Sequence, residues 1–228
     1  MFKPDYRRVL AAFAHPDDAE LTCFGTLALL RSLGAEVTIL VLTNGERSSS
    51  NAPGTRREEA VEAARLIDGD VLFANLPDGA VADCGEVVSE IDGYLRKTAP
   101  DLVITHFPLT NGFGHQDHER TAHLITNATL RVPEPAWLMY AEPAVNAIMF
   151  QPNLFVDITP YFPLKLEALA CHRRERNKPV VRSALVEVRA AWWAQQACGA
   201  VTTSARYEAF HLVKGVMSLG RTEAADND

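Results

Sequence analysis

The chain has 228 residues, with 22 Lys and Arg against 29 Asp and Glu, and its formal net charge is −7. An acidic balance disfavours a non-specific binder of nucleic acid or of anionic membranes, because both partners attract basic side chains. Hydrophobic residues make up 47% of the chain and charged residues 22%, which is the balance of a folded globular protein and not of a disordered one.

Membrane and secretory segments are not expected. No apolar run approaches the roughly 20 residues that a membrane-spanning helix needs, and the early apolar stretch at residues 9–14 is too short for a signal peptide. The four cysteines are scattered, with no Cys-x-x-Cys pair. We therefore expect reduced thiols in a cytoplasmic protein.

The first half of the chain alternates short apolar runs with stretches of helical periodicity. Four runs have the composition of strands buried on both faces: residues 9–14, 37–42, 70–74 and 101–106. Three stretches between them carry apolar residues at helical spacing: residues 21–34, 56–67 and 86–98. This alternation predicts βαβ units, and hence an α/β fold with a Rossmann-like, mostly parallel sheet and helices on both faces.

Beyond residue 132 the pattern is less regular. Shorter strands are predicted at residues 137–141, 153–158 and 207–213. A helix is predicted around residues 166–173, and the spacing of Leu185, Val188 and Trp192 predicts another. No repeat or linker divides the chain, so we expect a single domain over residues 1–220 and a frayed acidic tail over residues 221–228.

Two groups of metal-ligand residues follow predicted strands, at the edge where open α/β sheets bind ligands. The candidate ligands are His15, Asp17, Asp18, His115 and His118. Each group alone has a simpler interpretation, an aspartate that caps the next helix or a pair of surface histidines. Two such groups at one edge of the sheet, in a chain with only seven histidines, favour a shared metal site.

Two imidazoles and one carboxylate are the donor set of a catalytic zinc ion that keeps one position open for water. The same donors also hold Fe²⁺. The five candidates are more than the three ligands that a catalytic zinc ion needs. The surplus is informative, because hydrolysis also requires a base and an acid. Zinc lowers the pKa of its water to about 7, after which a free carboxylate accepts the proton and a protonated histidine stabilises the oxyanion and the leaving amine. Asp117 either orients an imidazole or is a solvated loop acid.

Several motifs, in this order, resemble the PIG-L/LmbE-like family of metal-dependent deacetylases. The motifs are Ala-His-Pro-Asp-Asp-Ala-Glu at residues 14–20, Thr-Asn-Gly-Glu at 43–46, Arg-Arg-Glu-Glu-Ala at 56–60, Leu-Pro-Asp-Gly at 76–79 and His-Gln-Asp-His at 115–118. The resemblance implies a zinc-dependent N-deacetylase, in which metal-bound water attacks the acetamide carbonyl of an N-acetylglucosamine-type sugar or conjugate. It also implies a small-molecule substrate and a homo-oligomer, trimeric or hexameric.

The resemblance also assigns roles to single residues. It makes His15, Asp18 and His118 the metal ligands, Asp17 the general base, and His115 the acid or oxyanion stabiliser. Arg56 is similar to an arginine that the family directs toward the substrate. The alternative interpretation is that Arg56 is a solvated cation at the start of a helix.

The sequence departs from the family pattern at three places. Gln116 replaces the commoner proline of the second motif, and Thr22 and Phe24 stand where glycines are frequent. Arg173 and Arg174 follow His172 where relatives carry Ser and Gln; they either favour an anionic group on the substrate or are solvated helix charges.

Two other functions are weighed against the deacetylase. A metal-dependent phosphoester hydrolase would use further aspartates to hold two ions. A nucleotide-binding module without chemistry would need a glycine-rich phosphate loop, and no Gly-x-Gly-x-x-Gly follows a predicted strand.

Overall fold

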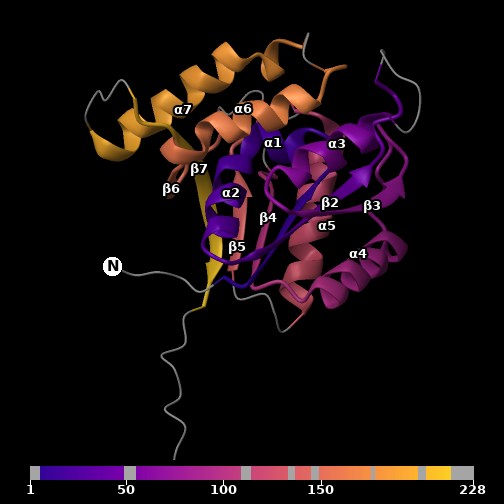
Figure 1. Ribbon diagram of the computed structural model, residues 1–228. Helices are drawn as coiled ribbons and strands as arrows, with labels where there is room; N and C mark the ends of the chain where they lie inside the picture. The colour runs from indigo at the N-terminus through magenta and orange to yellow at the C-terminus, as the bar shows by residue number, and fades with distance from the viewer. Residues whose placement is uncertain are drawn as a thin grey trace, which may run out of the picture.

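The computed structural model describes residues 6–48, 55–108, 114–132, 137–144, 149–175, 178–199 and 204–216. Within these residues a seven-stranded sheet runs in the order β3-β2-β1-β4-β5-β7-β6 (Figure 1). This arrangement confirms the predicted α/β fold with a mostly parallel sheet in one domain. The predicted frayed tail at 221–228 lies outside the described residues.

Five strands form the parallel part of the sheet: β1 (Arg8–Phe13), β2 (Glu36–Thr43), β3 (Asp70–Leu76), β4 (Leu102–His106) and β5 (Trp137–Ala141). Two strands complete it in antiparallel pairing, β6 (Leu154–Asp157) at the edge and β7 (Tyr207–Gly215) between β6 and β5. The chain order reverses at β1, whose two neighbours are β2 and β4. A crevice therefore opens beyond the carboxyl ends of β1 and β4.

Helices cover both faces of the sheet because the strand side chains alternate between two apolar cores. On one face Val9, Ala11 and Phe13 of β1 belong to a core shared with α2 (Phe24–Ser32), α3 (Thr55–Arg65) and α6 (Phe162–Cys171). On the other, Leu10 and Ala12 belong to a core with α4 (Gly85–Thr98) and α5 (Gln116–Arg131). Burial on both faces explains why the strands are continuous apolar runs.

The helix expected at residues 21–34 is instead two pieces, α1 (Asp18–Thr22) and α2, which meet at Cys23. The start of α2 is fixed by a buried carboxylate: Glu208 of β7 accepts hydrogen bonds from the backbone N–H groups of Gly25, at 3.0 Å, and Thr26, at 2.7 Å. Lys165 of α6 pairs with the same carboxylate. A negative charge at a helix N-terminus is favourable, and it holds the α1–α2 unit rigidly against the sheet.

The last helix, α7 (Ser183–Cys198), lies along the outer edge of the molecule, at the upper left of Figure 1. Its buried residues are Val186, Ala190 and Ala194. The sequence predicted this helix from the spacing of Leu185, Val188 and Trp192, but those side chains face solvent. None of the helices in the described part of the chain is long and apolar enough to cross a membrane.

Candidate active site and metal centre

The two predicted ligand groups meet at the carboxyl ends of β1 and β4. These strands pair directly, in register from Val9 with Leu102 onward, so the segments that follow them emerge side by side. His15 and Asp18 come from the turn after β1, and His118 comes from the first turn of α5. His15 Nδ1 lies 3.1 Å from His118 Nε2.

Spacing among these three side chains suits one small cation. Asp18 Oδ2 lies 3.4 Å from His15 Nδ1, and Asp18 Oδ1 lies 3.3 Å from His118 Nε2. Ligand atoms about 2.0–2.1 Å from a tetrahedral zinc ion are roughly 3.3 Å from each other. The three donors therefore have a spacing that fits a cation. Their chemistry fits as well, because nitrogen and oxygen atoms are the ligands that borderline and hard metal ions prefer.

The Asp18 carboxylate is buried among imidazole and backbone partners. Burial alone raises its pKa, but the neighbouring His118 and His106 imidazoles hold the pKa well below its usual range. His15 donates its backbone N–H to Asp18 Oδ2 at 2.8 Å, which fixes the carboxylate's orientation. An ionised, oriented carboxylate is the state in which a metal ligand acts.

His15 uses its other ring nitrogen for two carboxylates. Its Nε2 lies 3.1 Å from Asp78 Oδ1 and 3.5 Å from Asp117 Oδ2. Burial lowers the pKa of His15, but its contacts with Asp117, Asp18 and Asp78 outweigh burial and raise it well above the usual value. A carboxylate on the far nitrogen of an imidazole fixes its tautomer and orientation.

Asp117 is therefore no solvated loop acid. Its side chain is completely buried, and its two oxygens accept hydrogen bonds from the backbone N–H groups of Gly79, at 2.6 Å, and Val81, at 3.2 Å. It lies closer to His15 than to His115, whose Nδ1 is 4.0 Å away. Of the two imidazoles, the geometry favours His15 as the one that Asp117 orients.

We expect Asp117→Asn to weaken metal binding by about 10–100-fold, the usual cost of losing the carboxylate behind a ligating imidazole. Isothermal titration of the metal-free protein with Zn²⁺ measures this. Asp83→Asn is the matched control, because Asp83 is exposed on the segment before α4. Equal affinities in the two variants would contradict the orienting role.

His106 also lines the cavity; the sequence alone left open whether it lines the pocket or packs as a buried polar residue. It ends β4, and its ring stacks on His118 with centroids 4.1 Å apart. Its Nε2 accepts the N–H of Ala14 at 3.1 Å and lies 3.3 Å from Asp18 Oδ2. Burial lowers the pKa of His106 to about 4, so the neutral ring packs behind the cluster.

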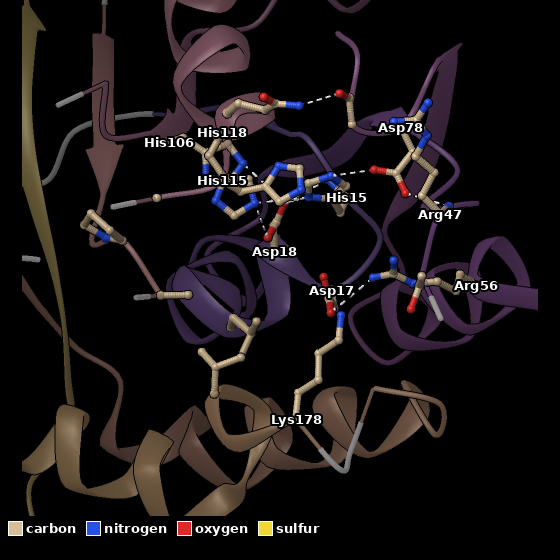
Figure 2. A pocket seen from close by; sticks show the side chains of 18 of the residues that line it. His15, Asp17, Asp18, Arg47, Arg56, Asp78, His106, His115, His118 and Lys178 are labelled. Atoms are coloured by element: carbon tan, nitrogen blue, oxygen red, sulfur yellow. Dashed lines mark hydrogen bonds and ion pairs between the residues drawn. The ribbon is translucent and has the colours of Figure 1, made fainter. Parts of the chain in front are cut away.

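Asp17 does not cap α1, since no hydrogen bond joins its side chain to the helix. Its backbone has φ 127°, a conformation that costs a non-glycine residue about 1–3 kcal/mol and is often retained at functional sites. This backbone turns the carboxylate into the cavity beside the metal-ligand cluster (Figure 2). Burial raises the pKa of Asp17 to about 6, although Arg56 opposes the rise.

Arg56 is 4% exposed, which rules out the solvated helix-start cation. Its Nη2 lies 3.2 Å from Asp17 Oδ2 and donates a hydrogen bond to the Pro16 carbonyl at 2.6 Å. α3 thus places a guanidinium directly against the turn that carries Asp17, and the same side chain lines the cavity.

Glu175, in the segment after α6, also supports the site, although no sequence pattern singled it out. Its buried carboxylate lies 3.8 Å from Arg56 Nε, accepts a hydrogen bond from Ser48 Oγ at 2.6 Å, and pairs with Lys178. These contacts join the segment after β2, the segment after α6 and Arg56 of α3. No spacing in the sequence signals such an arrangement.

His115 stands at the rim of the site as the N-terminal cap of α5. Its Nδ1 accepts the backbone N–H of Asp117 at 3.2 Å, so the neutral ring carries its proton on Nε2. Burial, with His15 and His118 nearby, lowers the pKa of His115. The side chain is 46% exposed, and it faces the same cavity as Asp17.

The cavity has a volume of about 780 Å³, within the range of small-molecule sites. Beyond the metal cluster its walls include Arg47, Gly79, Pro143, Ala144 and Lys178. Figure 2 shows Asp17, Arg56 and Lys178 on one side of the histidine cluster.

None of the departures from the family pattern replaces a candidate ligand. Gln116 donates a side-chain hydrogen bond to the Gly79 carbonyl, which links two loops of the rim. Arg173 is 56% exposed and pairs with Glu62 and Glu59 of α3. Neither Arg173 nor Arg174 is among the residues that line the cavity, so the geometry favours surface charges over a substrate anion site.

The chain is similar to known deacetylases in sequence, and its fold is similar to that of a solved one. A diacetylchitobiose deacetylase of Thermococcus kodakarensis is 27% identical over 75% of this chain and 71% of its own. A probable N-acetyl-alpha-D-glucosaminyl L-malate deacetylase 2 of Bacillus cereus is 27% identical over 74% of this chain and 84% of its own. The solved N,N'-diacetylchitobiose deacetylase of Pyrococcus horikoshii superposes with a TM-score of 0.80 at 24% identity, covering 92% of this chain and 85% of that one.

The family model PIG-L, described as GlcNAc-PI de-N-acetylase, matches residues 10–129. That match spans 120 of the 228 residues, more than half of the chain, and it contains most of β1, all of β4 and every candidate ligand. The chain belongs to the PIG-L family of deacetylases.

Proposed function

We propose that this protein is a metal-dependent N-deacetylase that hydrolyses the acetamide of an N-acetylglucosamine-type sugar or sugar conjugate, releasing acetate and a free amine. The observation that carries the proposal is the convergence of His15, Asp18 and His118 within 3.1–3.4 Å of one another, at the floor of a cavity that also contains an unligated carboxylate. Family relatives with deacetylase activity support it.

His15, Asp18 and His118 would hold the cation. A bound divalent metal lowers the pKa of water and polarises a carbonyl oxygen. Zinc suits this donor set best, and Fe²⁺ would also be accepted. The protein's contribution is orientation: Asp78 and Asp117 hold His15, and His106 packs against His118.

Asp17 is the proposed general base. A pKa of about 6 leaves most of the carboxylate ionised at neutral pH while keeping it more basic than an ordinary aspartate, which is the compromise that proton transfer favours. The Arg56 guanidinium, 3.2 Å away, fixes the orientation of the carboxylate. Arg56 also lines the cavity, where its remaining N–H groups can donate to substrate oxygens.

His115 is the proposed oxyanion stabiliser, donating a hydrogen bond and not a proton. The sequence analysis expected a protonated ring, whereas its lowered pKa and the Nδ1 contact favour a neutral ring with Nε2–H as the donor. A neutral N–H aimed at the developing oxyanion still stabilises it. The proton that Asp17 accepts would then pass from Asp17 itself to the leaving amine, because a neutral imidazole is not a proton source.

A phosphoester hydrolase with two metal ions is the competing reaction class. Asp78 and Asp117 lie beside the cluster as a second cation would require, but both face the far nitrogen of His15. Their role as partners of a ligand therefore explains them without a second ion. Metal stoichiometry separates the classes: about one ion per chain supports the deacetylase, and two ions about 3.5–4 Å apart support the alternative.

The direct test measures acetate release from free N-acetylglucosamine, its glycosides, nucleotide-linked forms and pseudodisaccharides, before and after removal of metal by a chelator. The proposal expects release from at least one of them, loss with the chelator, and recovery with Zn²⁺ or Fe²⁺. Phosphate release instead of acetate, or acetate release that a chelator leaves unchanged, would overturn it.

Glu175 should support the site through Arg56. We expect Glu175→Ala to lower kcat/KM by roughly 10–100-fold through misplacement of Arg56 and the Ser48 segment, with metal content unchanged. Steady-state kinetics and metal analysis measure the two effects. Glu167→Ala on the exposed side of α6 is the control, and identical kinetics of both variants would refute the role.

We also propose a cellular compartment and an oligomeric state for the protein. The four cysteines are free thiols in the structure, which supports a reducing compartment such as the cytoplasm. Assembly into trimers or hexamers, which the family resemblance implies, stays a prediction.

A further inference from the structure

His172 is a buried histidine outside the metal-ligand cluster. It caps the carboxyl end of α6 and has 0% of its surface exposed. It is not among the residues that line the cavity, so it does not reach a substrate held there. Neither of its ring nitrogens has a hydrogen-bond partner in the part of the chain that the structure describes. A buried imidazole in that state is costly unless a charge nearby compensates it.

The compensating charge is a carboxylate on α1, which lies beside α6 (Figure 1). His172 Nε2 lies 3.5 Å from Glu20 Oε2, and Glu20 is itself 2% exposed. Burial lowers the pKa of His172, but the Glu20 carboxylate and, at longer range, Asp17 outweigh burial and raise that pKa above its usual value. The two side chains therefore form a buried ion pair that joins α1 to the end of α6.

Stability alone does not explain the Glu20–His172 pair. The desolvation of two buried charges largely offsets their attraction, and neutral side chains of similar size often serve as well. A buried pair does fix geometry, because either partner moved away from the other becomes an uncompensated charge in the interior. α1 needs such a constraint, since its five residues are too few to form a stable helix without tertiary contacts.

The turn that leads into α1 is strained and carries the proposed base. Asp17 has φ 127°, and a backbone of this kind persists only where the surrounding structure over-determines it. Arg56 holds the Asp17 carboxylate from α3, at 3.2 Å. Glu20 is three residues further on, so it lies on the same side of α1, and His172 holds it from α6. Buried cations from two different helices thus hold consecutive turns of the same segment.

We propose that His172 is a positioning residue of the active site: its ion pair with Glu20 fixes α1, and α1 in turn holds the Asp17 carboxylate at the position of the base. One ion pair, with Arg56, sets the direction of that carboxylate but leaves the helix behind it free to shift. A second pair one turn away removes this freedom. The catalytic part of the inference rests on the proposed function, in which Asp17 is the general base.

Hydrogen–deuterium exchange in the presence of Zn²⁺ tests whether the pair fixes α1. Glu20→Gln/His172→Gln removes both charges together and leaves no buried charge unpaired, so this variant should fold. Its α1 backbone amides are expected to exchange at least about tenfold faster than those of the wild type.

Glu62→Gln/Arg173→Gln is the matched control for the paired variant. Arg173 follows His172 directly, and its 2.8 Å ion pair with Glu62 of α3 has both side chains about half exposed. Neutralising that pair should leave exchange in α1 unchanged. Wild-type exchange of α1 in Glu20→Gln/His172→Gln, or an equal rise in both variants, would overturn the proposal.

Acetate release tests the path through Asp17. In Glu20→Gln/His172→Gln, kcat and kcat/KM should fall together by about 10–100-fold, since a misplaced base weakens only the transition state, while metal content stays unchanged. In an Asp17→Asn background the same two substitutions should cause no further loss, because groups that act through one another are not additive. A further loss of the same size in that background, or a loss of metal, would refute the positioning role.

The two measurements separate this inference from the proposed function. A wild type that releases no acetate would overturn the proposed function, and exchange in α1 would still decide whether the Glu20–His172 pair fixes the helix. Normal acetate release together with unchanged exchange in α1 would overturn this inference alone.

Discussion

Asp17→Asn is expected to reduce acetate release by about 10²–10⁴-fold, the range that loss of a general base produces, while metal content stays at about one ion per chain. The substitution keeps the shape of the side chain and its place beside Arg56, but an amide cannot accept the proton. Because the ion pair of the Asp17 carboxylate in the described residues is with Arg56 and not with His15 or His118, metal content and acetate release should respond separately to the substitution.

Two controls sharpen this result. Zn²⁺ titration of the variant checks that Asp18, the neighbouring carboxylate, still binds, since Asp17 contributes to the electrostatic surroundings of Asp18. Asp68→Asn, at an exposed position after α3, controls for the loss of one negative charge. Full activity in Asp17→Asn would remove the base role, and loss of the metal along with activity would make Asp17 a ligand.

The place of the site could be predicted from the sequence because it depends on topology. Alternation of strands and helices predicts a parallel sheet, and parallel strands end at one edge. His15 and His118 are 103 residues apart, yet β1 and β4 are neighbours in the sheet. The place of the site could therefore be predicted from the residue types that follow the strands, without knowing the position of any side chain.

Side chains that support the site could not be predicted this way. Asp78 follows β3, which is separated from β1 by β2, and reaches His15 only through the path of its loop. Glu175 is buried against Arg56 and Ser48, whereas a lone glutamate in a sequence is normally read as solvated. Both positions depend on tertiary contacts that periodicity does not encode.

Which face of α7 is buried could not be predicted from the sequence either. Helical spacing correctly marked Leu185, Val188 and Trp192 as part of a helix, but it did not say which face of that helix is buried. The inner face uses Ala190 and Ala194 instead, whose small side chains let the helix approach the protein closely. When both faces of a helix are apolar, the sequence predicts the helix but not which face its own chain covers.

His118→Ala is expected to lose both metal and activity, which distinguishes a ligand from a base. His118 contributes one of three converging donors, with Nε2 3.3 Å from Asp18 Oδ1 and 3.1 Å from His15 Nδ1. The two remaining donors should bind a cation too weakly to retain it on dilution, so the metal content should fall well below one ion per chain. Acetate release should fall at least about 10³-fold, since the activation of water depends on the ion.

His123→Ala is the matched control for this prediction, because His123 lies on the same helix but is exposed to solvent. The two variants remove the same side chain from α5, so a difference in metal content between them cannot come from helix propensity or from the loss of an imidazole as such. Far-ultraviolet circular dichroism should be unchanged in both, because the His118 side chain is itself 23% exposed and lies outside the apolar cores. If His118→Ala keeps its metal and loses only its rate, the imidazole acts on the substrate and the ligand set must instead include His106, whose Nε2 already lies 3.3 Å from Asp18 Oδ2.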